Sequence, residues 1–88
     1  MGATKLDGMK RMQVEARLWD RHDAGIRDLL YALSYNPRRI IELRYGLSDG
    51  HCYSIQEIAD IFAKSTNWVI EIESTALFQL YQFCSPSA

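Results

Sequence analysis

Two amphipathic segments joined by a very short connection constrain the fold of this chain more than any other feature. Ser54 is suited to cap a helix N-terminus, and Glu57, three residues later, can reach back to complete a capping box. The apolar residues that then recur at helical spacing are Ile55, Ile58, Ala59 and Phe62. After a joint of about three to four residues, Ser65 or Thr66 can cap a second helix. The core stripe of that helix consists of Val69, Ile72, Ala76 and Leu80. Residues 53–80 therefore predict a helix-turn-helix.

Helical periodicity also extends over the preceding part of the chain, and no stretch alternates as a strand would. Apolar residues predict a helix that begins at Met9, a second over residues 26–33 and a third over residues 37–46. Gly25 is expected to break or bend the chain, and Gly46 to end the third helix.

The expected fold is therefore a single all-α domain of four to five helices that contains a helix-turn-helix. At 88 residues, helices packed pairwise with short loops are the architecture most easily stabilised. We expect three segments: a partly helical N-terminal extension (1–25), the helix-turn-helix domain (26–83) and a short tail (84–88).

Several classes of protein are excluded by the sequence. No run approaches the roughly 20 apolar residues of a membrane span, and the N-terminus lacks the apolar segment of a secretory signal. We therefore expect a cytoplasmic protein without a membrane partner. Cys52, Cys84, His22 and His51 show no metal-ligand spacing, so no metal or cofactor is expected. Without paired carboxylates, a phosphate loop or a nucleophile motif, the chain is not expected to be an enzyme.

Charge is distributed unevenly along the chain. The net charge is −1, but residues 1–44 hold nine Lys or Arg against six Asp or Glu. Residues 45–88 hold one Lys against five acidic residues, and no basic side chain follows Lys64. Because Lys and Arg neutralise nucleic-acid phosphates, the second helix of the helix-turn-helix is poorly equipped to bind DNA.

Three motifs follow one another in the second half of the chain. They are IIELRYGLSDG at residues 40–50, YSIQEIADIF at residues 53–62, and the later spacing of Ile72-Glu73, Ala76-Leu77 and Leu80. Together they resemble region 4 of bacterial sigma factors of the primary type. Residues 26–39 resemble the preceding helix of that region more loosely, and residues 1–25 lie outside the resemblance.

The resemblance implies two interaction surfaces. One would grip a flap of the RNA polymerase β subunit, and the polymerase-facing residues of this chain would be Leu33, Ile41, Arg44 and Leu47. The other would place the second helix of the helix-turn-helix in the major groove of a promoter element. The residual candidates for DNA contact are Lys64, Thr66, Asn67, Arg38 and Arg39. Arg38, Arg39 and Arg44 could instead form a solvated face, which is the usual fate of such a cluster, or meet an acidic partner.

The second helix departs from the family at the positions that read promoter bases. The family places Arg, Glu and Gln there, whereas this chain has Thr66, Asn67, Trp68, Ile70 and Glu71. Further along, apolar side chains stand where the family has cations. We define the apolar strip as Trp68, Ile70, Leu77, Phe78 and Tyr81. An exposed strip of this kind usually marks a partner surface.

Three explanations of the apolar strip are open. It could bind a protein: RNA polymerase, a sigma-type or anti-sigma-type protein, or a second copy of the chain. Residues 1–25 could instead fold back over it, with Met9, Met12, Ala16 and Trp19 as the covering stripe. A weak DNA contact could also remain.

The expected function is that of a stand-alone, non-catalytic transcription regulator that mimics region 4 and acts mainly through protein contacts. The alternative is a DNA-binding helix-turn-helix factor, or one subunit of a split sigma factor, that recognises a promoter element.

Overall fold

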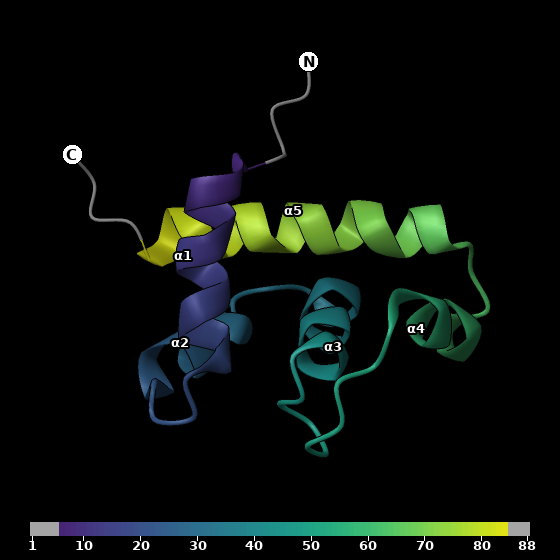
Figure 1. The fold of residues 1–88 in the computed structure, drawn as a ribbon, viewed down its shortest axis with the longest axis horizontal. Coiled ribbons are helices and arrows are strands. Elements are labelled where there is room, and N and C mark those ends of the chain that lie inside the picture. Colours follow the sequence, from purple (N-terminus) through teal and green to yellow (C-terminus); the bar gives the residue numbers. More distant parts are fainter. Residues whose placement is uncertain (1–5, 85–88) are drawn as a thin grey trace.

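The computed structural model describes residues 6–84, which form five α-helices and no strand. The helices are α1 (Gly8–Trp19), α2 (Ala24–Leu30), α3 (Tyr35–Arg44), α4 (Ile55–Phe62) and α5 (Thr66–Cys84). The longest helix, α5, runs across the molecule, with α1 crossing its C-terminal end and α4 lying near its N-terminal end (Figure 1). The prediction of an all-α fold is confirmed. Of the predicted tail (84–88), Cys84 is the last residue of α5, and residues 85–88 lie outside the described residues.

Side-chain caps start four of the helices: Asp7, Asp23, Ser54 and Ser65 cap α1, α2, α4 and α5. The predicted capping box of α4 is present: the Glu57 N–H donates to Ser54 Oγ (3.1 Å), and the Ser54 N–H donates to Glu57 Oε1 (2.8 Å). The hydrogen bond from the Ser54 backbone keeps the pKa of the Glu57 carboxyl below its usual value. Asp7 and Asp23 cap α1 and α2 in the same way, with Oδ1 accepting from Lys10 N–H and Ile26 N–H. Local sequence thus places these helix starts.

Predicted boundaries of α2 and α3 differ in the structure, and α2 ends at Leu30, three residues before the predicted end. Gly25 does not break the chain but is the second residue of α2, because Asp23 caps that helix and the connection falls just before it. α3 begins at Tyr35, two residues earlier than predicted, with Ser34 at its N-cap and Pro37 still in the first turn. Gly46 ends α3 as predicted, with a positive φ of 70° and the Leu47 N–H donating to the Glu42 carbonyl (2.8 Å).

The hydrophobic core has two parts, and both are built against α5. The first part lies under its C-terminal half and consists of Val14, Leu18, Ile26, Leu30, Leu33, Ile41, Tyr45, Ala76, Leu77 and Leu80. The second lies under its N-terminal half and consists of Ile40, Leu43, Ile58, Ala59 and Val69. Because α3 and α5 supply residues to both parts, these two helices connect the part of the core that contains α4 to the part that contains α1 and α2.

The face of α1 that packs inward is not the one that the fold-back explanation requires. Met9, Met12, Ala16 and Trp19 all lie exposed, and the exposed fractions of Met9 and Met12 are 73% and 67%. Val14 and Leu18, on the other side of the helix, are buried in the first part of the core. Since a helix repeats about every 3.6 residues, both sets have helical spacing, and the contact with α5 selects the Val14 side.

An ion pair closes the connection between α1 and α2. Arg17 Nε donates to Asp23 Oδ2 (2.6 Å) and Arg17 Nη2 donates to Asp23 Oδ1 (2.7 Å). These two charge-assisted hydrogen bonds lower the pKa of the Asp23 carboxyl from 3.8 to about 2.

The Asp23→Asn variant is expected to be less stable than the wild type near neutral pH, by at most about 1 kcal/mol because the pair is partly exposed. Asparagine keeps the Oδ1 acceptor that caps α2, but it removes the charge and replaces the Oδ2 acceptor of Arg17 Nε by an amide donor. A carboxyl whose pKa is lowered by folding contributes stability above its unfolded pKa and loses it as pH falls toward the folded one. The difference between the proteins, measured by urea unfolding, should therefore shrink from about pH 5 to pH 2. If the difference in stability stays constant over this range, the lost stability would come from the cap of α2 and not from the charge of Asp23.

Candidate interaction surfaces

The helix-turn-helix joint consists of Ala63, Lys64 and Ser65. Ala63 adopts the left-handed conformation, with φ of 56°, and the Lys64 N–H donates to the Ala59 carbonyl (2.9 Å). Ser65 Oγ then accepts from the Trp68 N–H (3.1 Å) and caps α5. The joint has the predicted length of about three residues, and it turns the chain sharply enough for α4 and α5 to pack on each other.

The N-terminal part of α5 exposes polar and apolar side chains but no cation. Asn67, Ile70 and Glu71 are exposed, and the exposed fraction of Ile70 is 42%. Across its 19 residues the helix carries no Lys or Arg. The neighbouring cation is Lys64, whose ammonium group lies 5.5 Å from the centroid of the Trp68 ring. Among the DNA-contact candidates, Lys64 and Asn67 are thus exposed together at the start of α5, next to the half-buried Thr66.

The five members of the apolar strip do not share one surface. Trp68 packs on Phe62, with ring centroids 5.5 Å apart, at the edge of the second part of the core. Leu77 is 1% exposed and belongs to the first part of the core, so it cannot form a partner surface. Tyr81 is half-buried, with the Lys10 ammonium group 5.5 Å from its ring. Ile70 and the half-buried Phe78 retain the more accessible apolar surface.

Residues 6–25 do cover part of α5, but through an unexpected face. α1 packs on α5 through Val14 and Leu18, which share the core with Leu77 and lie beside Tyr81. The stripe of Met9, Met12, Ala16 and Trp19 takes no part in this cover and faces outward. The packing of α1 therefore covers the C-terminal half of the apolar strip and leaves Ile70 exposed.

The residues that the resemblance places toward RNA polymerase also divide into two sets. Leu33 and Ile41 are buried in the first part of the core. Arg44 and Leu47 are half-buried, and Arg44 Nη1 donates to the Tyr53 carbonyl (3.3 Å). Of these four side chains, Arg44 and Leu47 are the ones that retain surface for a partner.

A buried charge cluster, not anticipated from the sequence, ties α1, α3 and α5 together. Glu73 is 3% exposed, yet its carboxylate oxygens lie 3.5 Å from Arg11 Nη2 and 3.4 Å from Arg44 Nε. Next to it, the Tyr45 hydroxyl donates to Glu15 Oε2 (2.8 Å), and burial together with this bond raises the pKa of Tyr45. The available signal was the position of Glu73 within the apolar stripe, four residues after Val69 and three before Ala76.

Arg38 and Arg39 lie on α3 and make separate contacts. The Arg38 guanidinium lies 5.5 Å from the Tyr31 ring and 5.9 Å from the Tyr35 ring, and both tyrosines are exposed. Arg39 Nη1 donates to Ser48 Oγ (2.9 Å) and to Glu42 Oε1 (3.3 Å). Arg38 is thus stacked between aromatic rings and Arg39 is partly neutralised by a carboxylate.

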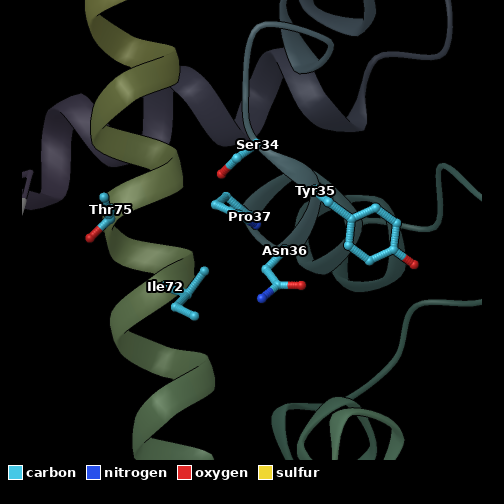
Figure 2. A pocket seen from close by; sticks show the side chains of 6 residues that line it. All are labelled: Ser34, Tyr35, Asn36, Pro37, Ile72 and Thr75. Atoms are coloured by element: carbon cyan, nitrogen blue, oxygen red, sulfur yellow. The ribbon is translucent and has the colours of Figure 1, made fainter.

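An open pocket of about 470 Å³ lies between the start of α3 and the middle of α5. Figure 2 shows Ile72 on α5 facing Asn36 and Pro37 on α3, with the Tyr35 ring directed away from α5. The remaining lining residues are Ser34 and Thr75, and the Thr75 hydroxyl donates to the Glu71 carbonyl (3.1 Å). The lining holds no carboxylate, imidazole, amine or thiol, so it offers no group for acid–base chemistry or nucleophilic attack near neutral pH.

Within residues 6–84, no three His, Cys, Asp or Glu side chains come together as a set of metal ligands. His51 Nε2 lies 3.7 Å from Glu57 Oε1 in an exposed setting, and Cys52 is an exposed free thiol. None of the helices in this part of the chain is long and apolar enough to span a bilayer.

Comparison with known proteins relates the chain to sigma factors. It is 41% identical over 71 residues to the chloroplastic RNA polymerase sigma factor sigF of Arabidopsis thaliana, an alignment that covers 81% of this chain and 12% of that protein. It is 42% identical over 57 residues to the RNA polymerase sigma-C factor of Nostoc sp., covering 65% of this chain and 14% of that protein. No family model and no solved structure matches the chain. The chain thus has a distant, partial similarity to RNA polymerase sigma factors, which suggests a role related to transcription.

Proposed function

We propose that this chain regulates transcription through protein contacts, as a region-4-like helix-turn-helix whose reading helix no longer recognises promoter bases. Its partner would be RNA polymerase, at the β flap, or a sigma-related protein. Two findings support this proposal: the partial similarity to sigma factors, and a joint of Ala63–Ser65 that sets α5 against α4 as in a helix-turn-helix. The role requires no catalysis by the chain itself.

The observation that carries the proposal is the absence of Lys and Arg from α5, all of whose residues are described. A helix that enters the major groove needs cations to neutralise phosphates, and arginine to bond guanine in a bidentate way. α5 instead presents Ile70 and Glu71 near its start and the partly exposed Phe78 further along. An apolar surface with an added carboxylate disfavours DNA and suits a protein partner.

Binding to purified RNA polymerase core enzyme, for example from Nostoc, tests the protein contact. The labelled full chain is titrated with the enzyme and binding is followed by fluorescence anisotropy. We expect Phe78→Asp to weaken binding at least about tenfold, since an aromatic anchor is replaced by a charge. Gln82→Asp adds the same charge to an exposed position one turn further along α5 and should change affinity less than about threefold. Equal affinities for wild type and Phe78→Asp, or no binding at all, would reject this partner.

The second candidate, DNA binding, rests on Lys64 and Asn67 at the start of α5, where asparagine could bond adenine. A salt titration separates the two functions. Binding that depends on phosphate neutralisation falls steeply as salt rises, whereas apolar protein binding changes little. We expect no sequence-selective duplex binding at about 150 mM salt. Tight, selective binding that is lost in Asn67→Ala would favour the DNA-binding function instead.

A further inference from the structure

The outer face of α1 is an apolar stripe without cover in the described part of the chain. It consists of Met9, Met12, Ala16 and Trp19, and Trp19 is 53% exposed. The spacing of three, four and three residues places them along one side of the helix, opposite the buried Val14 and Leu18. With about 1.5 Å of rise per residue, the stripe is about 15 Å long, or nearly three turns.

A groove continues the stripe beyond the end of α1. It has a volume of about 460 Å³ and lies between the end of α1, Arg27 on α2 and the residues that follow α3. The Trp19 ring packs edge-on against the Tyr45 ring, with centroids 4.8 Å apart, so Trp19 belongs to both the stripe and the groove. Leu47 adds a half-buried apolar wall on the other side.

The charge of the groove indicates what could occupy it. Arg21 and Arg27 both line it, and within residues 6–84 no carboxylate oxygen comes within 4 Å of either guanidinium. Arg27 Nη1 donates to the Arg21 carbonyl, which holds the Arg27 side chain beside Arg21. By contrast, Arg11, Arg17, Arg39 and Arg44 all have carboxylate partners. Two arginines in a groove that continues the apolar stripe favour a ligand that brings both carboxylates and apolar side chains.

We propose that the outer face of α1 and this groove bind an acidic amphipathic helix of a partner protein. The apolar side chains of that helix would pack on Met9, Met12 and Trp19, at the spacing of helix-in-groove recognition. Its carboxylates would meet Arg21 and Arg27. Methionine and tryptophan suit such an interface because methionine adapts its shape and tryptophan contributes a large rigid surface. Two cations are too few for nucleic acid, whose binding depends on many phosphate contacts.

This proposal goes beyond the function proposed above, since the surface is built from α1, α2 and the segment after α3 instead of the exposed face of α5. The probe is a fluorescent 18-residue peptide with leucine at helical spacing and glutamate on both flanks. A matched peptide carries lysine at every glutamate position. Binding of each peptide to the full chain is measured by anisotropy at physiological salt.

We expect the glutamate peptide to bind and the lysine peptide to bind at least about tenfold more weakly. Met12→Asp and Trp19→Ala should each weaken binding of the glutamate peptide at least about tenfold. The double change Arg21→Glu with Arg27→Glu should reverse the preference between the peptides. Met12 is exposed, so its replacement should leave the fold intact, which thermal unfolding of each variant verifies. Ile70→Asp, on the exposed face of α5, serves as the control and should leave peptide binding unchanged.

Several outcomes would overturn the proposal. Equal binding of the two peptides, or binding insensitive to Met12→Asp, would exclude this surface as an acidic-helix site. Self-association in analytical ultracentrifugation that Met12→Asp abolishes, without peptide binding, would assign the stripe to a second copy of the chain. Binding to anionic lipid vesicles that depends on Met12, again without peptide binding, would assign it to a membrane surface.

Discussion

Replacing Arg44 by methionine is expected to lower the free energy of unfolding by about 3–5 kcal/mol. The Glu73 side chain is 4% exposed, and Arg44 supplies one of the two cations next to its carboxylate. Once Arg44 is removed, Arg11 remains as the compensating cation, at 3.5 Å and from a partly exposed position on α1. A buried charge that loses part of its compensation is far more costly than the loss of an exposed ion pair.

Urea unfolding followed by far-ultraviolet circular dichroism measures this effect. Arg38→Met is the matched control on the same helix, because Arg38 contacts exposed tyrosine rings, and it should cost less than about 1 kcal/mol. The double variant Arg44→Met with Glu73→Met removes both charges and should regain most of the loss. A double variant as unstable as the sum of its single changes would show that Arg44 and Glu73 are not energetically coupled, and would reject an uncompensated carboxylate as the cause of the loss.

Leu77→Ala is expected to destabilise the protein by about 2–5 kcal/mol, whereas Phe78→Ala next to it should cost at most about 1 kcal/mol. Leu77 is packed among the core residues of α1, α2 and α3, so truncation leaves a cavity that the surrounding helices can only partly fill. Phe78 does not belong to this core and is only half-buried. Although the phenylalanine is the larger side chain, the leucine should therefore be the more important one for stability.

The same urea measurement tests this pair of variants, and polymerase binding tests whether Phe78 contributes to function independently of stability. If both substitutions cost similar, small amounts, α1 would not cover the C-terminal half of α5 in solution. In that case Leu77 would be available to a partner, as the sequence predicts.

Helix class and several helix ends follow directly from the sequence because they depend on interactions within a few residues. The Ser54–Glu57 capping box, the positive φ at Gly46 and the short joint at Ala63–Ser65 each satisfy backbone groups locally. The lack of cations on α5 is likewise a property of the sequence, and no packing arrangement can change it. The all-α class and the expectation of weak DNA binding therefore needed no coordinates.

The side of each helix that faces inward could not be derived in this way. α1 has two apolar stripes at helical spacing, and its contact with α5 buries Val14 and Leu18 while leaving Met12 and Trp19 exposed. Leu77 and Glu73 became buried because α1 and α3 reach α5 from distant parts of the chain. Periodicity shows that a helix face is apolar, whereas the burial of that face depends on which neighbours pack against it. Those neighbours are set by long-range packing, which no local pattern contains.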